Sequence, residues 1–337
     1  MQKRHLILCL LFSVIGFAQQ ADFKEIDFSK ADYIAEKVKV KRLYNLNKLT
    51  FNLTQNLPTD VEKVRAIYMW ICTNIANDFH LFALNDRKRN KYAQDSIKLV
   101  NWNSKFKKKL FKKLLKRKKT ICTGYAYLFK EMCNFAGIES KMVNGFGRTS
   151  AVDFSKLTMP NHTWNIVKLR NKWYLCDPTW SAGISLPQNG KFQFSYNNGY
   201  FLTEPKLFFQ NHFPLKKEYA LLGSKTPSFK TFTELPLLYG DAFKYIKTSP
   251  FPLKMYHQIK RDTIISFKYL LKENSTPKKI KFIVNNGNSN IEAKPATISL
   301  KKNELTLQHL FTKKGYFDLH LFFDDKIIAT YIFDVKK

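Results

Sequence analysis

The order of apolar and polar residues predicts two kinds of structure along this chain. In the first part, apolar residues recur at spacings of three and four, the period of a helix with one buried face. Helices are predicted within 23–57, after a capping box formed by Thr59 and Glu62, over 104–118, and from Thr120 to Gly137. Thr120 is the expected N-cap of that last helix and Gly137 its C-terminal stop. Between and after these helices, shorter runs alternate between apolar and polar residues, which predicts strands.

The alternating pattern is most regular after residue 240. It predicts strands at 263–271, 280–284, 296–300, 305–310, 317–323 and 327–335. Short strands separated by turns are typical of an immunoglobulin-like sandwich. The chain has 337 residues, more than one ordinary domain, and 45% of them are hydrophobic. We therefore expect a first domain over 19–225, in which helices and strands are mixed, a linker over 226–239 and an all-β sandwich over 240–337.

The segment 120–180 contains the residues with recognisable chemistry. Cys122 falls in the first turn of a predicted helix, where free backbone N–H groups and the helix dipole favour an anion. This position lowers the pKa of a cysteine from about 8.5 towards neutrality. The same N–H groups can bind the oxyanion of a tetrahedral intermediate. The alternative is that Cys122 is a small buried core residue, as most cysteines are.

Two strands are predicted at 162–168 and 172–177, joined by Arg170-Asn171. With this two-residue loop, paired residue numbers sum to 341, and Asp177 faces Trp164, on the same side of the sheet as His162. The imidazole and the carboxylate are then diagonal neighbours, roughly 7 Å apart at the backbone. A loop with an odd number of residues would place them on opposite faces.

Three motifs in this segment, Cys-x-Gly-Tyr-Ala at 122–126, His-x-Trp-Asn at 162–165 and Trp-Tyr-Leu-x-Asp-x-Thr-Trp at 173–180, resemble the transglutaminase-like superfamily. Segments 63–78, 201–205 and 212–214 resemble its kyphoscoliosis-peptidase-like branch. The resemblance implies a papain-like α+β domain in which helices pack on an antiparallel sheet.

The resemblance also assigns roles to individual residues. It makes Cys122 the nucleophile, His162 the general base and acid, and Asp177 the carboxylate that orients the imidazole. Thr123, Trp164 and Trp180 are expected to line the substrate site, although Thr123 departs from the residues common in the family. No second oxyanion donor can be matched. His212 is interpreted as a structural residue rather than a second base.

The N-terminal segment 1–18 resembles a signal peptide, because Lys3 and Arg4 precede an apolar run that ends in small residues at 16–18. The run is too short to span ~30 Å of hydrocarbon, which disfavours the alternative of a membrane anchor. We expect an exported protein, periplasmic or extracellular, with association to a membrane surface as one option.

Four cysteines follow that segment. Cys122 and Cys133 lie on one predicted helix, about 16 Å apart at ~1.5 Å per residue, too far for a disulfide. A bridge between Cys72 and Cys176 stays open. The chain has no Cys-x-x-Cys pair, so neither a structural zinc site nor any other metal or cofactor is expected.

The chain also has a large excess of basic residues. The chain has 57 Lys and Arg against 26 Asp and Glu, a net charge of +31. Basic residues are densest from Lys105 to Lys119, in the predicted amphipathic helix over 104–118. This helix is either a solvated element docked on the domain or a contact surface for an anionic membrane or polymer. Nucleic acid is the least favoured partner, because no nucleic-acid-binding motif is present.

The predicted function is an exported cysteine enzyme that acts on amide bonds of a protein or peptide through a thioester, with hydrolysis narrowly preferred to acyl transfer to an amine. The alternative is a catalytically silent binding or scaffolding protein of the same fold at the cell envelope. The oligomeric state stays open.

Overall fold

The computed structural model describes residues 19–149, 152, 157, 159–186 and 189–337. The predicted signal segment 1–18 and part of the loop predicted to lie over the site, 147–160, fall outside the described residues. Within the described ranges, no helix combines the length and apolar character needed to cross a membrane.

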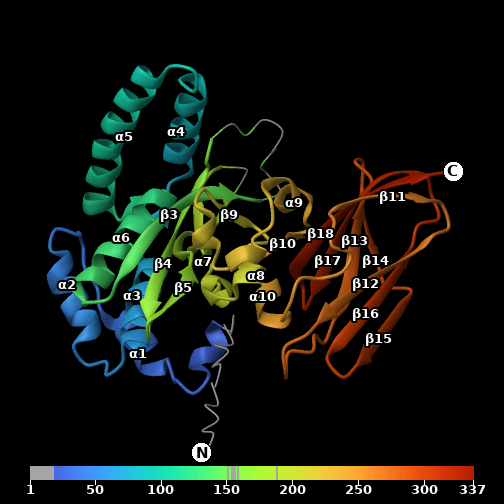
Figure 1. The fold of residues 1–337 in the computed structure, drawn as a ribbon, viewed down its shortest axis with the longest axis horizontal. Coiled ribbons are helices and arrows are strands. Elements are labelled where there is room, and N and C mark those ends of the chain that lie inside the picture. The colour runs from blue at the N-terminus through green and yellow to red at the C-terminus, as the bar shows by residue number, and fades with distance from the viewer. Residues whose placement is uncertain (1–18, 150–151, 153–156, 158, 187–188) are drawn as a thin grey trace, which may run out of the picture.

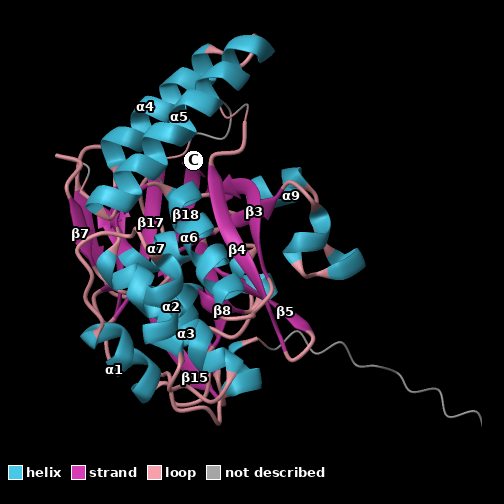
Figure 2. Cartoon of the chain, turned by 90° about the vertical axis from the view of Figure 1, so that its left-hand side faces the viewer, coloured by secondary structure: helices cyan, strands magenta, loops and turns pink. Residues whose placement is uncertain are grey.

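The N-terminal half is an α+β unit built around a five-stranded antiparallel sheet in the order β8-β5-β4-β3-β9. Strands β3, β4, β5 and β8 of this sheet are labelled in Figure 2. Its strands are β3 (Ser140–Gly147), β4 (His162–Leu169), β5 (Lys172–Cys176), β8 (Phe201–Thr203) and β9 (His212–Pro214). The helices are α1 (Ser29–Lys37), α2 (Leu46–Thr54), α3 (Asp60–Asn74), α4 (Phe79–Lys91), α5 (Ser96–Arg117), α6 (Cys122–Phe135), α7 (Pro178–Ala182) and α8 (Pro205–Phe208). Two smaller sheets complete the unit, one of β1 (Ala76–Asn77) with β2 (Lys119–Thr120) and one of β6 (Gly183–Ser185) with β7 (Phe192–Phe194).

Helices α3 and α6 show how local sequence sets the helix ends. The predicted capping box is present at the start of α3, where Thr59 and Glu62 bond each other's backbone N–H. At the start of α6 the prediction is wrong: Ile121 is the N-cap, not Thr120, and its side chain caps nothing. Thr120 instead packs against Gly124, where a Cβ would overlap the threonine side chain. Gly137, at φ +75°, ends the helix as predicted.

The predicted basic helix is longer than expected. Helix α5 begins at Ser96, because the side chain of Asp95 accepts a hydrogen bond from the Lys98 N–H. It packs against α4 as a helical hairpin that stands out from the rest of the domain (Figure 1). At the base of the hairpin, Lys113 of α5 forms an ion pair with the buried Asp78, the N-cap of α4.

The C-terminal half is a β-sandwich, which confirms the predicted fold class. One sheet has the order β10-β18-β17-β13-β14, with β11 also paired to β18, and the other has the order β12-β16-β15. Phe267 of β12 packs against Phe282 of β13 and Tyr331 of β18, so the two sheets share one core. The strands are β10 (Leu237–Leu238), β11 (Tyr256–Lys260), β12 (Ile264–Leu270), β13 (Ile280–Asn285), β14 (Asn290–Ala293), β15 (Thr297–Lys301), β16 (Glu304–Leu310), β17 (Gly315–Phe323) and β18 (Lys326–Lys336).

All six predicted C-terminal strands are present, and β10, β11 and β14 were not predicted. Strand β11 is paired on one side only, and strand β14 lies at the edge of its sheet. Their half-exposed side chains leave little apolar signal in the sequence.

The two halves are joined by a continuous apolar core. The segment 226–239 contains α9 (Phe229–Glu234) and strand β10, which pairs with β18 of the sandwich. Trp164 and Ile166 of β4 belong to the same buried cluster as Leu238 and the sandwich residues. The opposite face of β4, with Val167 and Leu169, packs into a separate cluster with α3 and α6. The central sheet is therefore covered on both faces, and β4 and β5 are held rigidly between the two cores.

Candidate active site

The backbone places the thiol of Cys122 at the start of α6. The short parallel pair β1–β2 and a 2.7 Å hydrogen bond from the Asp78 N–H to the Thr120 carbonyl fix the chain just before it. The first helical hydrogen bonds of α6 are donated by Gly124 and Tyr125, both to the Ile121 carbonyl. The N–H groups of Cys122 and Thr123 therefore come before the helical ladder begins. Cys122 is 8% exposed, at the end of a cleft.

Strands β4 and β5 bring His162 and Asp177 together. Leu169 pairs with Lys172 and Asn165 with Cys176, so paired numbers sum to 341, as the two-residue loop predicted. The Nε2 atom of His162 lies 2.7 Å from Oδ2 of Asp177. The other ring nitrogen, Nδ1, is left for the thiol, and Cys122 and His162 line the same cleft, where His162 lowers the pKa of the thiol. The structure thus brings together all three residues assigned to the triad.

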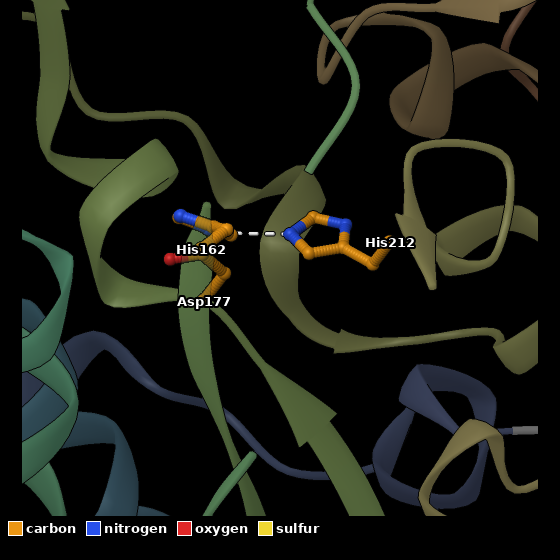
Figure 3. A group of neighbouring side chains, drawn as sticks. All are labelled: His162, Asp177 and His212. Carbon is orange, nitrogen blue, oxygen red and sulfur yellow. Dashed lines mark hydrogen bonds and ion pairs between the residues drawn. The ribbon is translucent and has the colours of Figure 1, made fainter. Parts of the chain in front are cut away.

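The carboxylate of Asp177 accepts four hydrogen bonds. Its Oδ1 accepts from the backbone N–H groups of Thr179 at 2.8 Å and Trp180 at 3.2 Å, because Asp177 is the N-cap of α7. Its Oδ2 accepts from His162 and from His212, whose Nε2 lies at 3.0 Å (Figure 3). Burial of the carboxylate raises its pKa, but the charge and hydrogen bond of His162 and the hydrogen bond of His212 outweigh burial. The pKa of Asp177 is therefore held well below its ordinary value.

Helix α3 and strand β4 hold this arrangement from behind. The hydroxyl of Tyr68 donates to the backbone carbonyls of Asp177 at 2.9 Å and Tyr200 at 3.0 Å. The side chain of Asn165 donates to the Ala126 carbonyl of α6 at 2.9 Å. This last bond fixes the helix that carries Cys122 against the strand that carries His162.

The thiol and the imidazole form a coupled pair. Burial opposes the thiolate, but the hydrogen bond and charge of His162 outweigh it and lower the pKa of Cys122. Burial likewise opposes the imidazolium, while Asp177 and Cys122 raise the pKa of His162 to about 10. Both shifts favour a thiolate–imidazolium ion pair at neutral pH. Trp180 stacks on the His162 ring with centroids 4.7 Å apart, a contact that also stabilises a positive ring.

The other three cysteines have the opposite electrostatic environment. Burial raises the pKa of Cys72 and Cys133 well above the ordinary value and raises that of Cys176 to about 12. All four thiols are free, so Cys72 and Cys176 do not form a disulfide.

A cleft of about 540 Å³ leads to Cys122 and His162. Its lining comes from the α4–α5 hairpin, the start of α6, strands β3 and β4, and Leu215. The hairpin contributes Phe106 and Leu110 as apolar lining, with Arg89 and Lys107 as the basic residues. Arg89 also donates to the Pro160 carbonyl at 2.9 Å, two residues before His162. The basic helix predicted from the sequence is thus one wall of the cleft.

Comparison with known families agrees with this geometry. The profile of the Transglutaminase-like superfamily matches residues 47–178, a range that includes Cys122, His162 and Asp177. This segment is a transglutaminase-like domain. The resemblance inferred from the three motifs is therefore confirmed.

Relatives of the transglutaminase-like domain include the Kyphoscoliosis peptidases of Mus musculus, 37% identical, and Homo sapiens, 36% identical, each over 199 residues. In both cases the match covers 58% of this chain and 27% of the relative. Hillarin of Drosophila melanogaster is 25% identical over 235 residues, covering 65% of this chain and 26% of Hillarin. The chain thus spans about a quarter of the length of these relatives. Among solved structures, the Lin-41 filamin domain matches 23% of this chain and 82% of its own, with 12% identity and a TM-score of 0.20.

The residues expected to line the substrate site lie in different places. Thr123 is on the wall of the cleft. Trp164 is completely buried behind His162, with ring centroids 6.0 Å apart, and the cleft lining includes neither Trp164 nor Trp180. The two tryptophans therefore support the imidazole from within the domain. Gly147 of β3 leaves the space they need, because a Cβ there would lie 3.0 Å from both His162 and Trp180.

His212 is a further residue of the site whose contact the sequence does not reveal. Its ring contacts the same carboxylate oxygen as His162. Its position, 35 residues after Asp177, carries no local pattern that would pair the two. A lone histidine at the start of the three-residue strand β9 gives only a weak signal in the sequence.

The transglutaminase-like domain contains one group of side chains that could hold a metal ion among the described residues. The ligand atoms of His162, Asp177 and His212 lie within 4.8 Å of one another. Both imidazoles contact Oδ2 of Asp177 at hydrogen-bond distance, and an ionised carboxylate accepts from N–H groups. We interpret the group as a hydrogen-bonded network.

Proposed function

We propose that this protein is a cysteine enzyme that acts on amide bonds through a thioester on Cys122. The observation that carries the proposal is a thiol whose pKa is lowered by His162 and that lines a cleft together with this histidine. His162 is in turn hydrogen-bonded to the buried carboxylate of Asp177, so the base lies between the nucleophile and the group that orients it.

Each step of the proposed reaction has a group to perform it. The thiolate of Cys122 attacks the carbonyl carbon of the amide, and the N–H groups of Cys122 and Thr123 can bind the resulting oxyanion. His162 gives its proton to the leaving amine, which departs and leaves a thioester. His162 then takes a proton from the incoming water or amine, and collapse of the second tetrahedral intermediate regenerates the thiolate.

We propose hydrolysis of a protein or peptide as the overall reaction. Two of the relatives are named peptidases, which supports this choice for the shared domain. Acyl transfer to an amine uses the same first half-reaction and differs only in the second nucleophile. Incubating the protein with peptide substrates, with and without an added primary amine, distinguishes the two by the mass of the product.

Selective alkylation tests the proposed nucleophile directly. Iodoacetamide at neutral pH should label Cys122 far faster than Cys72, Cys133 or Cys176, and His162→Ala should remove the difference. His309→Ala, in the sandwich, is the matched control and should leave labelling unchanged. Mass spectrometry after incubation with a substrate should detect the thioester on Cys122. Equal labelling of all four thiols in the folded protein would contradict the proposal.

A catalytically silent scaffold is the second candidate, and the charge of α5 is the observation that favours a binding role. Eight basic side chains of this helix are exposed: Lys98, Lys105, Lys107, Lys108, Lys109, Lys112, Lys116 and Arg117. Nearby, Ile97 is 74% exposed and Val100 62% exposed on the first turns of the same helix. This combination suits contact with an anionic membrane or polymer. Full cellular function in a Cys122→Ala protein would favour the scaffold.

We also propose that the protein is exported and that the basic face of α5 contacts an anionic surface outside the cytoplasm. Replacing Lys108, Lys109, Lys112 and Lys116 by Gln should weaken binding to vesicles that contain anionic lipid and should reduce the salt dependence of binding. Replacing four lysines of the sandwich, Lys268, Lys294, Lys301 and Lys302, is the charge-matched control. Equal loss of binding in both variants would show that net charge alone attracts the protein, and cell fractionation tests export.

A further inference from the structure

The immediate surroundings of His212 are unusual for a buried histidine. The side chain has no exposed surface, and each ring nitrogen has a polar partner within 3.0 Å. Nε2 contacts Oδ2 of Asp177 at 3.0 Å, and Nδ1 contacts Oδ1 of Asn211 at 2.7 Å. A neutral imidazole has one donor nitrogen and one acceptor nitrogen, so the nature of these partners determines its protonation.

Both partners are hydrogen-bond acceptors. Asp177 is an ionised carboxylate, which can only accept. The orientation of the Asn211 amide is fixed by its nitrogen, which donates to the Leu238 carbonyl at 3.1 Å and to the Tyr200 hydroxyl at 3.2 Å. Its oxygen therefore faces Nδ1, and the backbone carbonyl of Phe208 is a further acceptor for His212. Each nitrogen of the ring must carry a proton to satisfy these contacts.

The rings around His212 favour a positive charge. Phe208 stacks on the imidazole with centroids 3.9 Å apart and planes 20° apart. Trp180 lies at 4.4 Å, Trp164 at 5.0 Å and Tyr200 at 5.8 Å. Aromatic faces within about 6 Å of a cation attract it, and a cage of several rings is a recurrent way to hold one.

We propose that His212 is a second imidazolium of the active site, a positioning residue that keeps Asp177 ionised and directed at His162. Four groups of alternating charge then follow one another: the Cys122 thiolate, the His162 imidazolium, the Asp177 carboxylate and the His212 imidazolium. Their sum is zero, whereas a neutral His212 would leave one uncompensated negative charge in a buried network.

Two electrostatic effects compete at His212. Burial is the larger effect, and together with the positive charge of His162 it lowers the pKa of His212 to about 4. The Asp177 carboxylate and the Phe208 carbonyl raise the pKa, and the acceptors fixed at both ring nitrogens oppose the loss of a proton. Asp177 and His162 are the charged groups that face the ring, and Tyr200 is a titratable neighbour whose own pKa lies far above neutrality. Since three acceptors and four aromatic rings surround the imidazole, we expect the charged form to prevail at neutral pH.

Nuclear magnetic resonance of the full chain, with ¹⁵N in its histidine rings, tests the protonation state. The spectrum at neutral pH should contain a ring with protons on both nitrogens that is absent from a His212→Gln protein. His309→Gln, the matched control, should remove a different signal. A His212 ring with one unprotonated nitrogen at neutral pH would overturn the proposal. If His212→Gln does not fold, His212→Phe or assignment of the other histidines identifies the signal in the unmodified protein.

The pH profile of Cys122 alkylation tests the role of the charge. Glutamine supplies a neutral donor, so it mimics a neutral His212 but not an imidazolium. Loss of the positive charge should move the midpoint of the profile upward by about one pH unit and slow alkylation about tenfold at pH values below that midpoint. An unchanged midpoint in His212→Gln would show that the histidine acts only as a neutral donor and would overturn the proposal. The positioning role rests on the proposed function, whereas the protonation of His212 is measured without any turnover.

Discussion

Helix α6 carries a cysteine in its first turn and another in its last, and the two thiols have opposite properties. Cys122 has a lowered pKa, whereas burial raises the pKa of Cys133 well above its ordinary value. Both side chains are buried, so burial alone does not distinguish them. The difference arises because Cys122 contacts His162 and lies beside free backbone N–H groups, whereas Cys133 is surrounded by the apolar core of α3 and α6. A reactive thiol in this protein therefore depends on its polar neighbours, not on its exposure.

The largest expected difference between Cys122 and Cys133 is in the effect of replacing each by alanine on turnover. Cys122→Ala should lower turnover of any amide substrate by roughly 10⁶-fold, because the nucleophile is lost. Cys133→Ala should leave turnover almost unchanged. Steady-state rates of the two purified variants, both checked for folding by circular dichroism, measure the contrast. Comparable rate losses in the two variants would contradict the assignment of Cys122.

The carboxylate should have the next largest effect. Asp177→Asn keeps the size of the side chain but removes the charge that favours the imidazolium, and we expect a loss of ~10⁴-fold in kcat. Alkylation of Cys122 should slow in parallel, while Cys133 should stay unreactive. A variant with unchanged kcat would show that His162 does not need Asp177.

The pH dependence of alkylation should differ between the folded and unfolded chain. At pH 6.5, a cysteine with a pKa of about 8.5 is only about 1% thiolate, so Cys122 should react roughly 10- to 100-fold faster in the folded protein than in urea. The rate should fall as the pH drops below the lowered pKa of Cys122, when the thiolate is protonated. At high pH the ion pair should disappear as His162 loses its proton near pH 10. Identical profiles in both states would mean that the fold does not activate the thiol.

The smallest expected effect is on stability, and it concerns Cys133 in the last turn of α6. Cys133→Ala should lower the free energy of unfolding by about 1–2 kcal/mol, because it leaves a small cavity among completely buried side chains. Denaturant titration at pH 7 measures the loss. An unchanged midpoint would show that the core around Cys133 closes over the missing sulfur.

The sequence was sufficient to predict the register of β4 with β5 and the contact between His162 and Asp177 that follows from it. The loop Arg170-Asn171 fixes the pairing of β4 with β5, and Asp177 directly follows the second strand. Features of this kind can be predicted from the sequence because each depends on residues that are close along the chain. The capping box of α3 and the glycine that ends α6 were predicted for the same reason.

Other features depended on distant parts of the chain and could not be predicted. The two tryptophans expected at the substrate site support His162 from behind, because the sandwich covers the second face of the central sheet. Helix α5 is a wall of the cleft because contacts with distant residues hold the α4–α5 hairpin in place. Lys113 of α5 forms an ion pair with Asp78, and Arg89 of α4 donates to the Pro160 carbonyl.

The sequence by itself determined the local positions of the candidate residues: a cysteine at a helix start, a histidine on one strand and an aspartate directly after the strand paired with it. Only the tertiary structure decided the electrostatic state of that cysteine and the role of His212, whose ring is enclosed by four aromatic residues and joined to Asp177 from 35 residues away. The physical reason is that helix starts and strand pairing are encoded by neighbours in the sequence. The charge of a buried group depends instead on every polar atom that folding brings within a few ångströms of it.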